Sequence, residues 1–143
     1  MSRGEKQKAL ESLERFRSSF PTDARAYRNL GDLYLQLNNP QTALEYYQKQ
    51  AEYGVGRDKA EGYNNFGVVY GGYHKDHVAA RRYFSIAISE DSTFAMAYDN
   101  LAFASLALGD TTASIVAWQK YLMLEPSGAN ADDRRKRLNN LPH

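Results

Sequence analysis

The sequence predicts an all-α fold in which helical hairpins repeat along the chain and stack into a right-handed superhelix. Two observations lead to this prediction. One pattern of large and small residues recurs three times, and residues that cap or end helices stand within and between the recurrences. Repeats of this kind bury their apolar faces against one another, because one hairpin alone cannot form a core.

The recurring unit starts with a tyrosine, and the leading tyrosines Tyr27, Tyr63 and Tyr98 stand 36 and 35 residues apart. A large apolar residue, a glycine or alanine and a further residue follow at i+3, i+4 and i+7, which places all four on one helix face. We therefore expect a helix to begin each unit. The three versions are Tyr27-x-x-Leu30-Gly31-x-x-Tyr34, Tyr63-x-x-Phe66-Gly67-x-x-Tyr70 and Tyr98-x-x-Leu101-Ala102-x-x-Ser105.

A second helix is expected in each unit, because a small residue is followed four positions later by an aromatic ring. The glycine of the first helix costs about 1 kcal/mol of helix propensity relative to alanine, so its presence indicates that a neighbouring group needs the space. Small against large is how two helices pack closely. The second-helix pairs are Ala43 with Tyr47, Ala80 with Phe84 and Ser114 with Trp118.

Residues that cap and end helices divide the chain where this arrangement requires it. Asp23 and Asp76 can cap helices, and Asn39 before Pro40 offers an N-cap followed by a proline at the first helical position. The remaining turns are expected at Gly54-Val55-Gly56, Gly71-Gly72, Gly109-Asp110 and Glu125-Pro126.

This pattern resembles the tetratricopeptide repeat family, in which aromatic-x-x-Leu-Gly-x-x-Tyr is followed by Ala-x-x-x-Phe and a proline. The resemblance covers residues 24–128 and implies a solenoid of helix pairs. Val55 and Ser92 stand where the family has proline, Gln50 where it has a small residue, and Ala102 where it has glycine. The expected ranges are a half-repeat or capping helix at 5–20, repeats at 24–59, 60–94 and 95–128, and a C-terminal capping helix at 129–141.

The C-terminal segment reads as a helix whose acids precede its basic residues, which suits the helix dipole. We expect Ala131, Leu138 and Leu141 to lie on the last repeat while the charges face water. The rival interpretation is a nucleic-acid patch at residues 134–137. Four basic residues behind two acids make that patch weak.

The composition is that of a protein that buries a core, with 43% hydrophobic and 24% charged residues. A net charge of +1 provides no general attraction to nucleic acid or to an anionic membrane, so neither is an expected partner. No apolar run approaches the roughly 20 residues that cross a bilayer, and no secretion signal is seen. We therefore expect a soluble, cytoplasmic protein. The absence of cysteine excludes disulfides and thiol chemistry.

The concave face of such a superhelix is lined by the first helices and is suited to holding a peptide or a partner helix. Two places after the leading tyrosines stand Asn29, Asn65 and Asn100. A carboxamide both donates and accepts, so it can pair with one peptide unit of an extended ligand. The three resemble the asparagine ladder of some tetratricopeptide grooves. The other residues expected to line this peptide-binding groove are Arg25, Arg28, Asp32, Asn64, Val68, Asp99 and Phe103.

A plainer interpretation of the three asparagines stays open. The inner face tolerates any short polar residue, and these side chains then serve helix caps or hydrogen bonds between repeats.

The function expected from this fold is that of a protein interaction module, a scaffold or adaptor that binds a protein or peptide partner. The alternative is self-assembly, including a homo-oligomer, or docking within a larger complex. No catalytic residues, cofactor or metal are expected. His74 and His77 lie in a turn with no third ligand in sight, and neither a phosphate-binding loop nor a nucleophile elbow is present.

Overall fold

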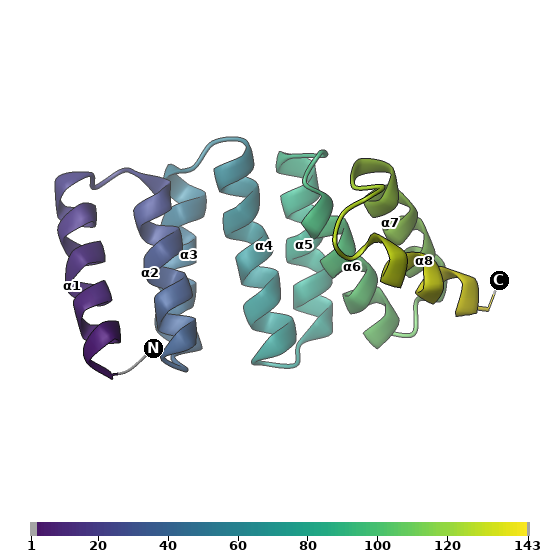
Figure 1. Cartoon of the computed structure of the whole chain (residues 1–143), viewed down its shortest axis with the longest axis horizontal. Helices are drawn as coiled ribbons and strands as arrows, with labels where there is room; N and C mark the ends of the chain where they lie inside the picture. Colours follow the sequence, from purple (N-terminus) through teal and green to yellow (C-terminus); the bar gives the residue numbers. More distant parts are fainter. Residues whose placement is uncertain (1–2, 143) are drawn as a thin grey trace.

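The computed structural model describes residues 3–142, and within them the chain is entirely helical, without a strand. Figure 1 shows the helices side by side in chain order, from the N-terminal to the C-terminal end of an elongated molecule. None of these helices is both long and apolar enough to span a bilayer. The helices are α1 (Arg3–Ser19), α2 (Ala24–Gln36), α3 (Pro40–Tyr53), α4 (Arg57–Gly72), α5 (His77–Glu90), α6 (Ala95–Ala107), α7 (Thr111–Leu124) and α8 (Ala131–Asn140).

The helices pack as successive hairpins. Helix α2 packs on α3, α4 on α5 and α6 on α7, and the second helix of each hairpin also contacts the first helix of the next. The first helices α2, α4 and α6 contact one another in turn along one side of the molecule. This arrangement confirms the predicted fold of stacked helical hairpins.

Side-chain caps explain where four of the helices begin. Asp23, Asn39, Asp76 and Asp110 precede α2, α3, α5 and α7, and each accepts a hydrogen bond from a backbone N–H two or three residues further on. Those N–H groups have no partner inside the helix, so the cap satisfies them.

Helix α6 begins without a side-chain cap, and so does α4. Gly56 precedes it with a positive φ of 52°, a conformation that a residue with a Cβ rarely adopts. The turn is therefore completed early. As a result α4 begins at Arg57.

Stacked tyrosines account for part of the unusual tyrosine content of eleven residues. Tyr34 and Tyr46 stack with ring centroids 5.3 Å apart in the first hairpin. Tyr70 and Tyr83, at the same repeat positions in the second hairpin, stack at 5.3 Å as well. Such pairs add stabilisation beyond their buried area. The third hairpin has serine and alanine at these positions, so it lacks the pair.

The two ends of the array are packed less tightly than its middle. Of the α1 residues whose side chains are described, none is fully buried, and Leu10, Leu13 and Phe16 are half-buried. The hydroxyl of Tyr46 on α3 donates to Glu14 of α1 at 2.9 Å. Helix α1 thus has the place of the second helix of a preceding hairpin.

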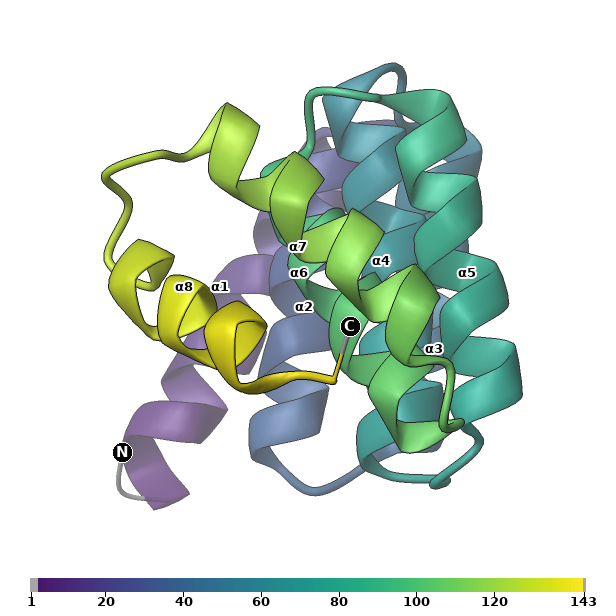
Figure 2. The same cartoon turned by 90° about the vertical axis from the view of Figure 1, so that its right-hand side faces the viewer.

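Helix α8 packs on the last hairpin, as Figures 1 and 2 show at the C-terminal end of the row. Leu138 and Leu141 contact the buried cluster of Ala102, Ala117 and Trp118, as expected. The expectation that the charges of this helix all face water is wrong for Arg134, whose side chain is only 12% exposed. Its guanidinium reaches inward to an acid on α6, which repays the cost of burying it.

Candidate binding groove

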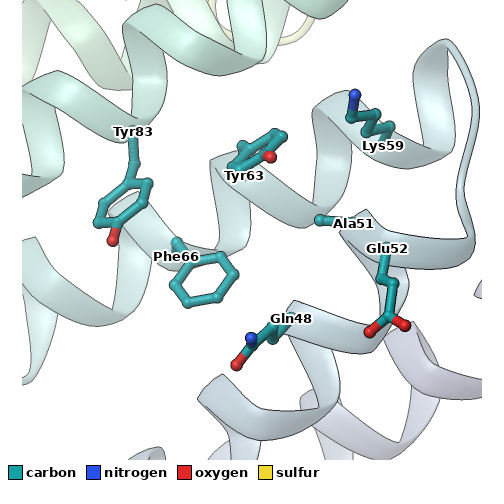
Figure 3. Close-up of a pocket in the computed structure, with 7 residues that line it drawn as sticks. All are labelled: Gln48, Ala51, Glu52, Lys59, Tyr63, Phe66 and Tyr83. Carbon is teal, nitrogen blue, oxygen red and sulfur yellow. The ribbon is translucent and has the colours of Figure 1, made fainter.

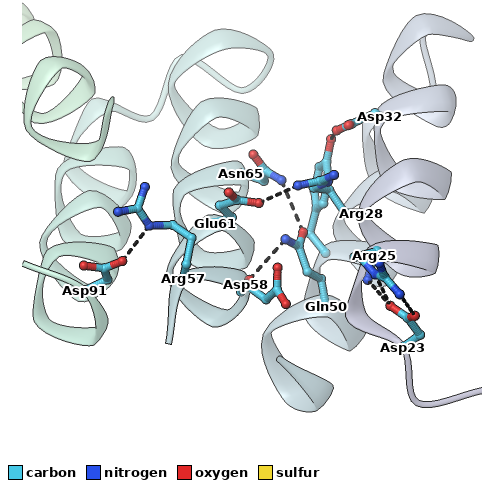
Figure 4. Close-up of polar contacts among 11 residues, drawn as sticks. Asp23, Arg25, Arg28, Asp32, Gln50, Arg57, Asp58, Glu61, Asn65 and Asp91 are labelled. Atoms are coloured by element: carbon cyan, nitrogen blue, oxygen red, sulfur yellow. Dashed lines mark hydrogen bonds and ion pairs between the residues drawn. The ribbon is translucent and has the colours of Figure 1, made fainter. Parts of the chain in front are cut away.

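The candidate groove is the face of α2, α4 and α6 whose residues do not pack inside the hairpins. The residues that follow the leading tyrosines connect neighbouring first helices. Nη1 of Arg28 on α2 lies 2.8 Å from Oε2 of Glu61 on α4, a pair that Figure 4 shows. One repeat later, Nδ2 of Asn100 on α6 donates to Oδ1 of Asn64 on α4 at 2.9 Å. Each pair of neighbouring first helices is therefore joined by a polar contact.

The third repeat continues this series with α8 in the place of a further first helix. Asp99 on α6 accepts two hydrogen bonds from Arg134 of α8, at 2.6 Å from Nε and at 2.7 Å from Nη2. The indole Nε1 of Trp118 donates to the same carboxylate at 2.9 Å. The hydrogen bonds with Asp99 raise the pKa of Arg134 above its ordinary value. Asp99 is 3% exposed, and both of its carboxylate oxygens already accept hydrogen bonds within the chain.

Two of the three asparagines predicted to form a ladder take part in hydrogen bonds within the chain. Nδ2 of Asn65 donates to Oε1 of the buried Gln50 at 3.3 Å, and Gln50 in turn donates to the carbonyl of Asp58 at 3.1 Å (Figure 4). Asn100 donates to Asn64, as described above. The carboxamide of Asn29 makes no hydrogen bond within residues 3–142. The plainer interpretation thus describes part of what these residues do.

The N-terminal end of the groove carries the charges of α2. The exposed Arg25 pairs with Asp23, with Nη2 and Oδ2 2.6 Å apart, and its hydrogen bonds lower the pKa of that carboxyl group. Asp32 accepts a hydrogen bond of 2.7 Å from the hydroxyl of Tyr47. Burial, followed by this hydrogen bond, raises the pKa of Tyr47. Figure 4 shows Asp23 and Arg25 at the start of α2 and Asp32 further along the same helix.

A hollow of about 260 Å³ lies in the groove between α4, α5 and α6. Val68 and Phe103 are 38% and 37% exposed, which is high for apolar side chains. Gly71 and Gly72 contribute no side chains, which leaves the hollow open. The Asn100 side chain is the polar group of its lining on the α6 side. The residues that line it are Gly67, Val68, Gly71, Gly72, His77, Ala80, Phe84, Asn100, Phe103 and Ala104.

A larger hollow of about 600 Å³ lies between α3, α4 and α5 (Figure 3). Three of its lining residues are aromatic: Tyr63, Phe66 and Tyr83. Lys59 lines it as well and is paired with Glu90 at 3.0 Å. None of the residues expected to line the groove contributes to it.

The histidines near the turn between α4 and α5 have separate surroundings. His74 packs against Tyr70 with ring centroids 5.4 Å apart, whereas His77 lines the hollow of the groove. Within the described residues, no three histidine, aspartate or glutamate side chains are grouped closely enough to hold a metal ion.

Sequence reasoning missed two residues that organise this surface. In the sequence, Gln50 stands out only as a departure from the family pattern, although it is 1% exposed and joins α3 to α4. The sequence also predicts that Arg134 faces water. A signal for its inward position was present, because Ala131, Arg134, Leu138 and Leu141 are spaced by three, four and three residues and so share one helix face.

Comparisons with known proteins agree with this architecture. A family model described as tetratricopeptide repeat matches residues 1–53. A crystal structure of MamA superposes with a TM-score of 0.72 and 21% identity, covering 96% of this chain and 82% of that one. The crystal structure of the APC/C hetero-tetramer Cut9-Hcn1 gives a TM-score of 0.77 and 21% identity, over 94% of this chain and 27% of that one. No curated protein matches the sequence. At these identities the superpositions establish the fold.

Proposed function

We propose that this tetratricopeptide repeat protein is an interaction module, a scaffold or adaptor that holds an extended segment of a protein partner in the groove along α2, α4 and α6. The observation that carries the proposal is the hollow at Val68 and Phe103. Partly exposed apolar side chains beside a polar carboxamide are the composition of a binding pocket, and glycines keep this hollow unfilled.

The polar groups around the hollow support an extended ligand. Among the described residues, Asn29 has no partner for its carboxamide, whereas Asn65 and Asn100 each use one N–H and keep the carbonyl oxygen and a second N–H. These groups can pair with the main chain of a peptide while the hollow takes one apolar side chain. Arg25, Arg28 and Asp32 extend this surface toward the N-terminal end. Asn64 and Asp99 are buried beneath it.

The experiment is a selection of random peptides of about twelve residues on the intact chain, followed by titration of the selected peptides. Val68→Asp places a charge in the hollow and is expected to weaken their binding at least tenfold. Val55→Asp is the matched control, because Val55 is exposed in the turn between α3 and α4 and does not line the hollow. Asn29→Ala removes a carboxamide that no other described residue uses, so a loss of peptide affinity in this variant is assigned to the asparagine ladder.

Selected peptides that bind both aspartate variants with the same affinity contradict the groove as their site. Failure to select any peptide that binds the chain contradicts the proposal as a whole. Circular dichroism of both variants establishes that helix content is unchanged.

A second function, assembly with another copy or within a larger complex, is favoured by the outer face of α7. Val116 and Met123 are 55% and 72% exposed there, at positions where the earlier second helices carry Glu45 and Arg82 or Glu52 and Ser89. Light scattering tests it: a mass above that of the monomer that falls to the monomer value in Val116→Asp supports assembly through this face, and a monomer at all concentrations contradicts it.

A further inference from the structure

We propose that the third-repeat end of the groove is an arginine-binding site, which α8 fills with Arg134 and which an arginine-bearing helix of a partner occupies when α8 is displaced. The site consists of Asp99, Phe103 and Trp118. It shares Phe103 with the hollow but takes a different ligand, and it stands whether or not a peptide binds beside Val68.

The geometry is specific for a guanidinium group. Both oxygens of Asp99 accept from Arg134, through Nε and Nη2, in the fork arrangement that the planar arginine group fits. The guanidinium carbon lies 4.7 Å from the ring centroid of Phe103, at the distance of a cation–π contact. The indole of Trp118 fixes the carboxylate with a third hydrogen bond. A lysine ammonium cannot match this fork.

While α8 is docked, the buried carboxylate of Asp99 needs a cationic partner. Asp99 is nearly inaccessible, and an ionised carboxylate in such a position is costly unless it is paired and hydrogen-bonded. Trp118 supplies one donor and no charge. Whenever α8 leaves, the site therefore binds water or another guanidinium, and the guanidinium restores both the charge balance and the two lost hydrogen bonds.

Besides this contact, helix α8 is held by few others. Only Ala131 is fully buried in it, while Leu138 and Leu141 are half-buried and most of the other side chains are exposed and charged. Its exposed acids pair with arginines of the same helix: Asp132 with Arg135, and Asp133 with Arg134 and Arg137. The connection from α7 contains Pro126 and Gly128 and no helix, so α8 can detach without unfolding the hairpins.

The spacing of the α8 residues that occupy the site indicates which sequence a partner helix needs. Arg134 enters the carboxylate while Leu138, one turn further, contacts the apolar cluster. A competing segment therefore needs an amphipathic helix with an arginine and, four residues later, an aliphatic residue. The guanidinium carbon of Arg137 also lies 5.4 Å from the ring centroid of Phe103, but the carboxylate of Asp99 holds only one guanidinium, that of Arg134.

The test uses the intact chain carrying Arg134→Ala and a synthetic peptide of residues 129–142. Trp118 is the only tryptophan of the chain, so its fluorescence reports the site directly. The peptide is expected to bind this variant saturably, at least tenfold more tightly than it binds the wild-type chain, where α8 competes from within. A peptide with Arg134→Ala is expected to bind at least tenfold more weakly, and one with Arg135→Ala, which removes an exposed arginine, equally well.

Equal binding of the Arg134→Ala peptide, or equal binding by the wild-type chain, overturns the proposal, as does the absence of saturable binding by a folded variant. If Arg134→Ala does not fold, the chain with Leu138→Ala and Leu141→Ala opens the same site by removing the apolar contacts of α8, and the same order of peptides is required. Val68→Asp, added to either variant, is expected to leave the binding of the 129–142 peptide unchanged. Because the same substitution weakens binding in the hollow, it separates this proposal from the proposed function.

Discussion

Gly31 on α2 lies so close beneath the ring of Tyr47 on α3 that a Cβ on the glycine would stand 2.5 Å from Cε1 of the tyrosine. The ring is 1% exposed and donates its hydroxyl to Asp32, so it is held in place from both ends. The contact between these two helices therefore depends on the absence of a side chain at one position. Gly67 has the same relationship to Phe84 in the next hairpin.

Gly31→Ala is expected to destabilise the chain. The added methyl group meets a buried ring that cannot move away, and overpacking of this kind costs about 1–3 kcal/mol. Alanine gains about 1 kcal/mol in helix propensity over glycine, so the variant loses stability wherever the overpacking cost is above that gain. Urea denaturation followed by circular dichroism measures the change in the free energy of unfolding.

Gly72→Ala provides the control, because a Cβ there has no neighbouring atom within 4 Å. It is expected to leave stability unchanged or to raise it by a few tenths of a kcal/mol, since only the propensity term remains. Equal losses in both variants would contradict the account of the Gly31 contact.

Asp91 is expected to make the stability of the chain depend on pH in the acid range. Hydrogen bonds from the Thr93 hydroxyl and Arg57, together with the Thr93 backbone N–H, lower its pKa to about 2. An unfolded aspartate has a pKa of about 3.9, so the folded state binds this proton less well, and the resulting stabilisation is complete above about pH 4. It is lost as the pH falls toward 2.

Urea denaturation of the wild-type chain and of Asp91→Asn between pH 2.5 and 6 tests this pH dependence. The wild type is expected to be the more stable of the two at pH 6, and the difference should shrink as the pH falls. Subtracting the variant removes the contribution of the other carboxyl groups. A difference that is constant over this range would show that Asp91 has an ordinary pKa.

Asp76→Ala is expected to reduce the free energy of unfolding by about 1 kcal/mol, because Oδ1 of Asp76 accepts the hydrogen bond of the Ala79 N–H at 2.9 Å at the start of α5. Asp58→Ala is the matched control, since Asp58 lies in the first turn of α4 but makes no side-chain cap. It should cost only a few tenths of a kcal/mol through the helix dipole. Thermal and urea denaturation of both variants measure the difference.

Arg134→Ala is expected to release α8 while the three hairpins stay folded. Removing one partner of a buried ion pair costs about 3–5 kcal/mol if the other charge stays buried, and undocking α8 exposes Asp99 to water and so avoids that cost. Hydrogen exchange of the α8 amides should accelerate in this variant. Lys136→Ala, which changes an exposed side chain with no hydrogen bond or ion pair among the described residues, should leave the exchange rates as they are in the wild type.

The hairpins and most of their caps were predictable from the sequence because they rest on local spacing. Gly31 and Tyr47 belong to the same hairpin, and Asp76 caps a helix that starts next to it. The contacts between repeats were not predictable in the same way. Asn64 meets Asn100, and Asp99 meets Arg134, across 36 and 35 residues, and which polar side chains pair depends on how far one helix is shifted along the next. The groove residues could be named, but not their bonding partners.

The three polar contacts that join the first helices respond differently to ionic strength. The Arg28 and Glu61 pair is partly exposed and is weakened by salt, the Asn64 and Asn100 contact carries no net charge, and the Asp99 and Arg134 pair is shielded from ions by its burial. Added salt is therefore expected to loosen the N-terminal junction first. The molecule then bends more easily at one end than at the other, and its curvature becomes a property that the solvent can adjust.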